Sequence, residues 1–235
     1  MALKSRVIFF DLDDTLYPAE EIYQKGLKAA WRRLNSFYPI SWQRFLQTYT
    51  RARREVKSRL GQVAAAHNRI LYFKRLVEIL YGQSQPATVL ELMRAYNTCW
   101  SLIQPASTRR LAERLSREYR LGVVTNQVTG FQLEKIRRID PSGRWFKILV
   151  TSEEVGCEKP DRRFFKEACR LAKCRPSEAI VVGDSWHGDI LGARRAGLLG
   201  VYVAPGPLSK KLPPGVTHAR SLAGVEAAIR DLSQS

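Results

Sequence analysis

The stretch VIFFDLDDT, residues 7–15, decides the fold of this chain. Its first four residues are β-branched or aromatic, which is typical of a buried strand, and carboxylates follow directly. Side chains at i and i+2 of an extended segment point the same way, so Asp11 and Asp13 face one site. Two carboxylates on one side repel each other unless a cation or a chemical task keeps them there. A helix cap explains Asp14 or Thr15 but leaves the pair unexplained, so the stretch predicts a functional site.

Length and composition indicate a globular protein. The chain has 235 residues, 45% of them hydrophobic, enough for one large core or a core with a smaller second domain. No apolar run approaches the roughly 20 residues of a membrane helix, and residues 7–10 are too short for a signal peptide. We therefore expect a cytoplasmic protein without a membrane partner. The cysteines show no CxxC spacing, so we expect reduced thiols rather than a zinc site.

Residues 17–104 have the hydrophobic periodicity of helices rather than of strands. Proline or glycine interrupts this pattern at Pro39, Gly61, Gly82 and Pro105. We expect helices over residues 20–37, 41–60, 68–81 and 86–103. Four successive helices predict a small helical bundle, inserted directly after the first strand.

From Pro105 onward, segments of helical periodicity alternate with short apolar runs. We expect strands over residues 121–125, 148–151, 179–183 and 201–203, with helices over 108–118, 131–138, 161–173 and 190–196. This alternation predicts an α/β fold with a parallel sheet and helices on both faces. Residues 205–215 are expected to form a surface loop, and residues 221–232 a closing helix. The α/β core would then comprise residues 1–16 and 105–235, and the helical domain residues 17–104.

Three other predicted strands also end near polar residues. Thr125 and Asn126 follow one strand, Lys159 follows another, and Asp184 and Asp189 follow a third. Right-handed parallel connections bring all these carboxyl ends to one edge of the sheet. Each residue alone also fits a turn, a surface charge or a helix cap. The ordered set predicts a catalytic site.

These residues resemble the four motifs of the haloacid dehalogenase superfamily, in the same order. The motifs are DLDDT at 11–15, TN at 125–126, EKP at 158–160 and GDSWHGD at 183–189. The resemblance implies a Rossmann-like core, with residues 17–104 similar to the type 1 cap of that superfamily. It also implies a phosphoric monoester hydrolase, a Mg²⁺-dependent phosphatase acting on a sugar phosphate, nucleotide or similar small metabolite.

The same resemblance implies roles for the acidic residues. Asp11 would be the nucleophile that forms an aspartyl-phosphate. A carboxylate about 4 Å from a phosphate meets roughly 4 kcal/mol of repulsion per charge pair, so a cation is required. Asp11, Asp184 and phosphate oxygens suit Mg²⁺, and the backbone carbonyl of Asp13 with waters would complete the site. Asp189 would orient those waters or ligate more distantly.

The resemblance also implies roles in binding and proton transfer. Lys159 would neutralise Asp11 and the phosphoryl oxygens. Thr125 would donate its hydroxyl to a phosphoryl oxygen, assisted by backbone N–H groups near Leu12 and Asn126. Asp13 would be the general acid, because the other carboxylates and the phosphate exceed the positive charge of Mg²⁺ and Lys159. Excess negative charge favours a proton on the carboxylate that the metal does not hold.

Other functions remain open from the sequence. A haloacid dehalogenase needs neither a second aspartate in the first motif nor a metal, so Asp13 with Asp184 favours phosphoryl chemistry. A phosphomutase shares these residues and differs in a cap that excludes water. Tyr17, Tyr23 and Arg69 are candidates for contacts with the leaving group, or for packing.

The net charge of +17 is also typical of a different class of function, a basic nucleic-acid-binding protein without catalysis. Residues 17–104 hold 14 Lys and Arg against 5 Asp and Glu. A cluster on the second predicted helix comprises Arg51, Arg53, Arg54, Lys57 and Arg59. These residues lie opposite the apolar stripe, as on any solvated helix face. The cluster therefore fits a solvated face, the steering of a phosphorylated substrate, or contact with nucleic acid.

Overall fold

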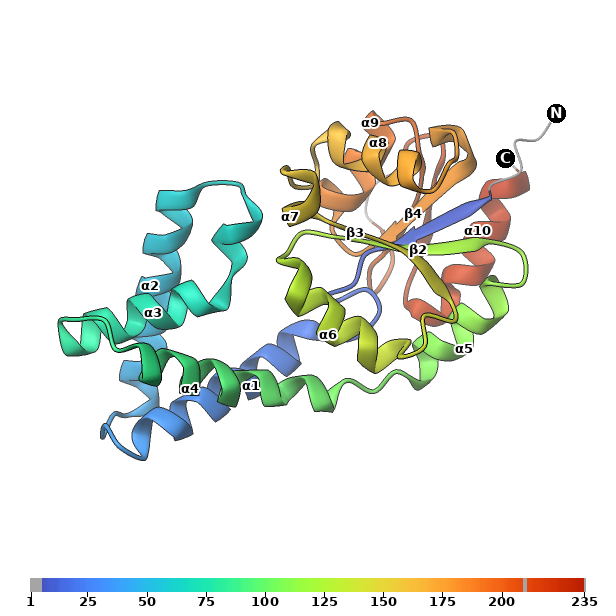
Figure 1. Ribbon diagram of the computed structural model, residues 1–235. Coiled ribbons are helices and arrows are strands. Elements are labelled where there is room, and N and C mark those ends of the chain that lie inside the picture. Colours follow the sequence, from blue (N-terminus) through green and yellow to red (C-terminus); the bar gives the residue numbers. More distant parts are fainter. Residues whose placement is uncertain (1–5, 209–210, 235) are drawn as a thin grey trace. The chain divides into compact units, whose positions relative to one another are not determined.

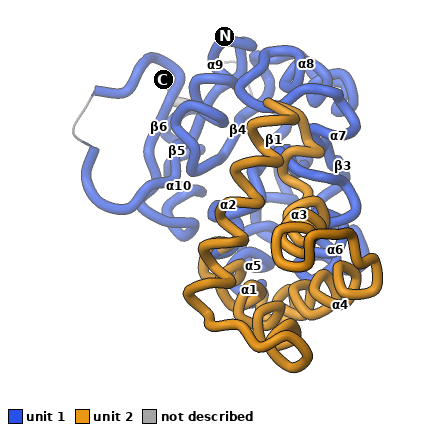
Figure 2. The backbone as a smooth tube through the Cα atoms, turned by 90° about the vertical axis from the view of Figure 1, so that its left-hand side faces the viewer, with its two compact units in different colours: residues 1–18, 104–235 blue, residues 19–103 orange. Residues whose placement is uncertain are grey.

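The computed structural model describes residues 6–208 and 211–234 (Figure 1). The chain divides into two compact units (Figure 2). The core unit comprises Met1–Pro18 and Gln104–Ser235, and the helical unit comprises Ala19–Ile103. These bounds lie within two residues of the division at 17–104 that the sequence indicates.

A six-stranded parallel sheet forms the centre of the core unit, in the order β3-β2-β1-β4-β5-β6. The strands are β1 (Val7–Phe10), β2 (Arg120–Thr125), β3 (Phe146–Thr151), β4 (Ala179–Gly183), β5 (Leu199–Val203) and β6 (Val216–Ala219). All four residues of β1 are buried, because β2 and β4 flank this strand and helices cover the sheet. The predicted parallel α/β fold is confirmed, and the strand that carries the acids is central.

Helices cover both faces of this sheet, as predicted (Figure 1). They are α5 (Ala106–Leu115), α6 (Thr129–Ile139), α7 (Ser152–Val155), α8 (Arg162–Leu171), α9 (Gly192–Arg195) and α10 (Val225–Gln234). Val7 and Phe9 of β1 share one hydrophobic core with Phe164 and Phe165 of α8. Burying such side chains contributes about 1.5–3 kcal/mol each, so this packing fixes β1 and the acids that follow it.

Several elements of the core unit differ from the predictions, among them the unpredicted short helix α7, the strand β6 and the helix after β4. Residues 216–219 form the edge strand β6, which the sequence analysis did not predict. Thr217 and His218 of this four-residue strand are half-buried, so it lacks a clear apolar pattern. The helix predicted over residues 190–196 begins earlier, as a π-helix over Trp186–Leu191 that Ser185 caps. Residues 209 and 210 of the predicted loop lie outside the described residues.

The helical unit contains α1 (Ala19–Asn35), α2 (Trp42–Leu60), α3 (Arg69–Tyr81) and α4 (Pro86–Asn97). The 3₁₀-helices η1 (Ala64–His67) and η2 (Thr98–Leu102) follow α2 and α4. The helix predicted over residues 86–103 is therefore α-helical only to Asn97 and continues as η2. The side chain of Ser41 accepts a hydrogen bond from the N–H of Arg44 and caps α2. Gly82 adopts a left-handed conformation (φ 73°) and ends α3.

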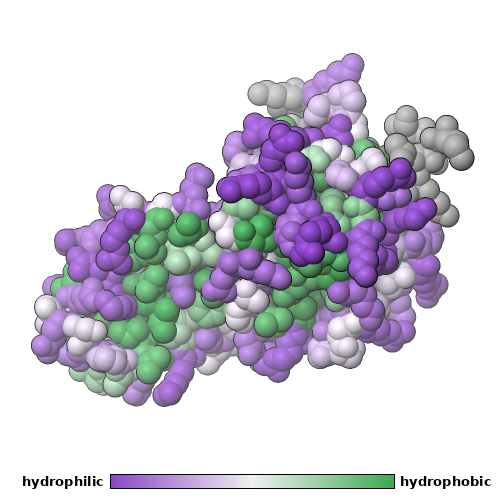
Figure 3. All heavy atoms as spheres, turned by 45° about the horizontal axis from the view of Figure 1, so that its top comes forward, coloured by the Kyte–Doolittle hydropathy of each residue, from purple (hydrophilic) through white to green (hydrophobic). Residues whose placement is uncertain are grey.

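The surface of the helical unit carries both polar and apolar side chains. Figure 3 shows hydrophilic and apolar residues side by side on this unit. Its exposed large apolar residues are Phe37, Val63, Leu90 and Leu102. Among the described residues, the structure contains no helix with the length and apolar character needed to span a bilayer.

Candidate active site

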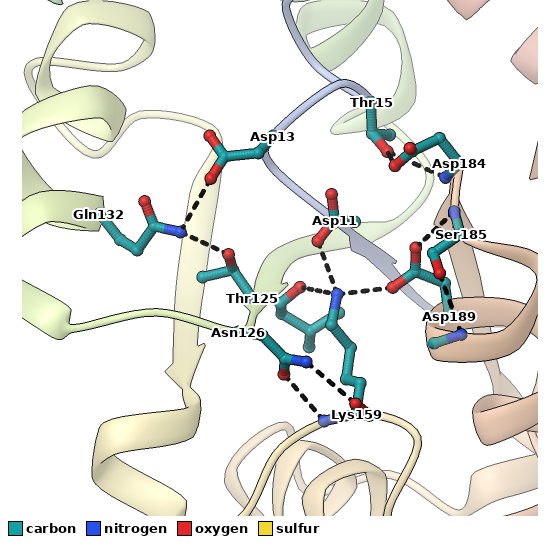
Figure 4. A network of polar contacts seen from close by, with 12 residues as sticks. Asp11, Asp13, Thr15, Thr125, Asn126, Gln132, Lys159, Asp184, Ser185 and Asp189 are labelled. Atoms are coloured by element: carbon teal, nitrogen blue, oxygen red, sulfur yellow. Dashed lines mark hydrogen bonds and ion pairs between the residues drawn. The ribbon is translucent and has the colours of Figure 1, made fainter. Parts of the chain in front are cut away.

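The carboxyl ends of three neighbouring strands bring the predicted site residues together (Figure 4). Asp11 directly follows β1, Thr125 ends β2, and Asp184 directly follows β4. Lys159 lies between α7 and α8, and its side chain points toward Asp11 (Figure 4). The parallel topology therefore places residues that are far apart in the sequence at one edge of the sheet.

Lys159 is the buried cation at the centre of this group. Its Nζ atom donates hydrogen bonds to Asp11 Oδ1 at 2.6 Å, to Asp189 Oδ1 at 2.5 Å and to the carbonyl oxygen of Val124 at 3.0 Å. Burial disfavours the ammonium, but the carboxylates of Asp11 and Asp189 outweigh this effect and raise the pKa of Lys159. Lys159 therefore stays charged, in a fixed position against the predicted nucleophile.

The ionised form of Asp11 is disfavoured by more than Lys159 alone offsets. Burial raises the pKa of Asp11 to about 8, Lys159 opposes this shift, and the charge of Asp189 adds to it. A carboxyl group in this environment needs additional positive charge to be fully ionised at neutral pH. The environment of Asp11 is therefore suited to a second cation.

The acidic side chains at this edge form one compact group. Asp11, Asp184 and Asp189 each present a carboxylate oxygen, and these oxygens all lie within 4.8 Å of one another. A set of oxygen ligands fits a hard divalent cation such as Mg²⁺. Burial raises the pKa of Asp184, although a hydrogen bond from Thr15 lowers it. The carboxylate of Asp13 does not belong to this group, and its predicted backbone contribution to a metal site stays a prediction.

Thr15 and Ser185 hold two of these carboxylates and were not among the predicted site residues. The hydroxyl of Thr15 donates to Asp184 Oδ1 at 2.9 Å and accepts from the Asp184 N–H at 3.1 Å. The N–H of Ser185 donates to Asp189 Oδ2 at 3.0 Å, so both oxygens of Asp189 accept hydrogen bonds. Asp189 is therefore bound to its surroundings more completely than Asp184.

A second network surrounds Asp13, and sequence reasoning missed its cation. Lys135 of α6 is buried, and its Nζ atom lies 2.9 Å and 2.8 Å from the two carboxylate oxygens of Asp13. The hydroxyl of Tyr17 also donates to Asp13. The predicted charge balance around Asp13 omitted this lysine and was therefore incomplete.

Gln132, also on α6, connects Asp13 to Thr125 (Figure 4). Its Nε2 atom donates to Thr125 Oγ1 at 2.5 Å and to Asp13 Oδ2 at 3.5 Å. Because Thr125 accepts this bond, the proton of its hydroxyl remains available to another acceptor. In the sequence, these residues are a glutamine and a lysine three positions apart on the helix that follows the second motif. Solvated helices show the same spacing, so it does not indicate a functional site.

The remaining predicted residues lie beside the carboxylates. Leu12 is buried between Asp11 and Asp13 in the chain. The side chain of Asn126 donates to the carbonyl oxygen of Lys159 at 2.9 Å and accepts from the Lys159 N–H at 2.8 Å. Asn126 therefore fixes the backbone that presents Lys159. Phosphate binding by the N–H groups near Leu12 and Asn126 stays a prediction.

Comparison with known proteins identifies the family. The model of the haloacid dehalogenase-like hydrolases matches residues 5–197. A ribulose-1,5-bisphosphate 5-phosphatase from Halopiger xanaduensis is 36% identical over 203 residues, covering 84% of each chain. A glyceraldehyde 3-phosphate phosphatase from Methanothermobacter thermautotrophicus is 33% identical over 202 residues, covering 84% of this chain and 85% of that one. The 2-haloacid dehalogenase of Pseudomonas syringae has a similar fold, with a TM-score of 0.71 at 22% identity over 97% of this chain and 99% of that one. The chain therefore belongs to the haloacid dehalogenase-like hydrolases.

Proposed function

We propose that this protein is a Mg²⁺-dependent phosphatase that hydrolyses a small phosphorylated metabolite through an aspartyl-phosphate on Asp11. The observation that carries the proposal is the buried Asp11 carboxylate, bonded to Lys159 and grouped with Asp184 and Asp189. The two relatives named above are a sugar bisphosphate phosphatase and a triose phosphate phosphatase, which supports a phosphorylated sugar as the substrate class.

Asp11, Asp184 and Asp189 would hold the cation through their carboxylate oxygens. When bound, Mg²⁺ offsets the repulsion between Asp11 and the phosphoryl oxygens. Lys159 supplies a second positive charge from within the protein, and Thr125 directs its hydroxyl proton to a phosphoryl oxygen.

The proposed reaction has two steps at phosphorus. Asp11 attacks the phosphorus atom, the ester bond breaks, and Asp13, which must enter this step protonated, gives that proton to the departing alcohol oxygen. Water then attacks the phosphorus of the aspartyl-phosphate, Asp13 takes a proton from that water, and phosphate leaves with Asp11 restored. Asp13 needs a fixed position for both transfers, and its bonds to Lys135 and Tyr17 supply that position. Lys135 is therefore a positioning residue.

The helical unit would serve as the cap that selects the leaving group, and residues 1–16 with 105–235 as the catalytic core. Its insertion directly after the first motif supports this assignment, because the residues grouped around Asp11 all belong to the core unit. A haloacid dehalogenase is less well supported, since Asp13 and its buried partner Lys135 serve no purpose in displacing halide from carbon. A phosphomutase would differ in transferring the phosphoryl group to an alcohol instead of water.

A panel of phosphorylated metabolites tests the proposal, with phosphate release as the readout and the Asp11→Asn protein as the blank. We expect release from at least one sugar phosphate, loss of release on chelation, and recovery with added Mg²⁺. Release by Asp11→Asn at the rate of the unaltered protein would contradict the proposal, as would no release from any ester. Transfer of the phosphoryl group to an added sugar phosphate would indicate a phosphomutase.

A further inference from the structure

The helical unit contains a cavity of its own, about 110 Å³ in volume. Every residue that lines it belongs to residues 19–103. Three cationic side chains, Arg53, Lys57 and Arg69, line the cavity together with one carboxylate, Glu20. A cavity holds one water in about 10–15 Å³, so this one has room for a small chemical group. Its lining therefore favours a group with negative charge.

Tyr49 of α2 adds a hydroxyl to the wall of the same cavity. The residue lines the cavity and is 7% exposed, and its hydroxyl has no hydrogen-bond partner among residues 6–208 and 211–234. A tyrosine hydroxyl on the wall of a cavity can donate a hydrogen bond to an acceptor that enters the cavity. Burial raises the pKa of Tyr49 to about 12, with Arg69 and Arg53 opposing the shift, so the hydroxyl remains a donor at neutral pH.

Arg69 is held in place before any ligand arrives. Its Nε atom donates to Tyr96 Oη at 3.0 Å, and its Nη1 atom donates to the carbonyl oxygen of His67 at 3.1 Å. Its guanidinium also lies 4.3 Å from the centre of the Tyr23 ring. An arginine fixed in this way loses little conformational entropy when it binds an anion, which favours binding.

We propose that this cavity binds the phosphate or carboxylate group of a small anionic ligand, through Arg53, Lys57, Arg69 and the hydroxyl of Tyr49. The group belongs either to the substrate, as a second anionic group beside the phosphoryl group that is removed, or to a separate anion. That the group belongs to the substrate rests on the proposed function. That the cavity binds an anion does not rest on it.

Fluorine NMR of the full-length protein with fluorotyrosine at position 49 tests the site, with inorganic phosphate as the probe. We expect a saturable shift of the resonance as phosphate is added. Arg53→Met should weaken this binding about tenfold, the scale of one lost hydrogen bond to a charged group. The matched control is Arg54→Met, which removes the next exposed arginine of α2, outside the cavity lining, and should leave binding unchanged. No saturable shift, or equal weakening by both substitutions, would overturn the proposal.

Steady-state kinetics then identify the source of the anionic group. If the group belongs to the substrate, Arg53→Met and Tyr49→Phe lower kcat/KM for phosphoglycerate about tenfold and leave glycerol phosphate within about twofold. If both esters are unaffected while phosphate binding is lost, the ligand is a separate anion, and the site is again supported. Equal losses with both esters, without a change in phosphate binding, count against it. The NMR titration needs no turnover, so a protein that hydrolyses neither ester would refute the proposed function and leave this test intact.

Discussion

Two buried lysines form ion pairs with different carboxylates of the site. Lys159 binds Asp11 and Asp189, whereas Lys135 binds both oxygens of Asp13. Each lysine approaches from a different element, since Lys135 lies on α6 and Lys159 precedes α8. The proposed nucleophile and the proposed proton carrier therefore have different cationic partners, although only Leu12 separates them in the chain, and the pKa of Asp11, which burial raises, is raised further by the charge of Asp13.

The role of Asp13 predicts a dependence on the leaving group. Asp13→Ala should nearly abolish turnover of an alkyl phosphate, because the departing alkoxide needs a proton. It should spare more of the activity toward p-nitrophenyl phosphate, whose leaving group is stable without one. Steady-state rates with both esters provide the measurement. Equal losses with the two esters would exclude Asp13 as the general acid.

The role of Lys135 predicts effects on both stability and turnover. Lys135→Met leaves the Asp13 carboxylate without its ammonium partner, and the Asp13 side chain is 23% exposed, so water replaces the partner only in part. We expect a loss of about 1–3 kcal/mol in the free energy of unfolding, measured by guanidinium denaturation. The value of kcat for an alkyl phosphate should fall more than its KM changes. Lys147→Met, at an exposed lysine of β3, is the control and should alter neither quantity.

At the scale of single elements, the end of β4 leaves no room for a side chain. A Cβ atom on Gly183 would lie 2.4 Å from Cγ of Asp189, which is buried and bonded to Lys159 and to the Ser185 N–H. Glycine is therefore required where this strand turns into the loop that carries Asp184 and Asp189.

Gly183→Ala should consequently displace Asp189 from Lys159, lowering both the melting temperature and kcat. Gly130→Ala in α6 is the matched control, since a Cβ there meets nothing within 4 Å. The control should retain activity and gain up to about 1 kcal/mol, because alanine favours helix more than glycine does. Thermal unfolding and phosphate release test both variants. Full activity in Gly183→Ala would show that Asp189 does not need its present position.

Tyr49 predicts how the stability of the protein changes in alkali. Its pKa is about 12 in the folded state against an ordinary value of 10.0, so the folded state retains the proton longer. Its contribution to stability is full below pH 10 and declines toward pH 12, by up to about 1.4 kcal/mol per pH unit. Tyr49→Phe should therefore lose less stability than the unaltered protein between these pH values. Parallel declines in denaturation experiments would contradict the assignment.

The elements that could be predicted are those in which local pattern and tertiary packing agree. Residues 7–10 and 179–183 are continuous apolar runs and form central strands, where both faces are buried. Ser41 and Gly82 mark helix ends through capping, which depends on neighbouring residues alone. The strand β6 was not predicted because it is four residues long, its two middle residues are half-buried, and it lies at the edge of the described sheet, next to β5.

The sequence predicts the site residues that follow strands. It does not predict the site residues that lie on a helix face. Asp11, Thr125 and Asp184 follow apolar runs, so parallel topology alone predicts that they meet. Lys135 and Gln132 reach the site from α6, and a sequence does not distinguish a buried lysine from a solvated one at that spacing. Three-dimensional contacts were required to find them.

At the scale of the whole molecule, the residues of the basic cluster of α2 have different surroundings. Arg51 pairs with Glu55, Arg53 and Lys57 line the cavity, and Arg54 and Arg59 are exposed. We expect the ion pair of Arg51 and the cavity positions of Arg53 and Lys57 to leave fewer of these charges for a phosphate backbone. We therefore expect the charge of +17 to serve small anions and solvation more than nucleic acid.

This interpretation predicts that random double-stranded DNA does not retain the protein at about 0.15 M salt, where charges are screened beyond about 8 Å. Weak retention at low salt is expected from net charge alone. A salt titration of fluorescence anisotropy with labelled DNA provides the measurement. Retention at physiological salt, with a steep linear dependence on the logarithm of the salt concentration, would restore the nucleic-acid alternative.

Formation of an aspartyl-phosphate on Asp11 is tested most directly by mass spectrometry of the protein quenched in acid during turnover of a sugar phosphate with Mg²⁺. We expect the peptide containing residues 7–15 to gain the mass of one phosphoryl group, and fragmentation to place this group on Asp11. Asp11→Asn should show no such gain. Rapid phosphate release without any phosphorylated Asp11, or with the phosphoryl group on another residue, would exclude Asp11 as the nucleophile.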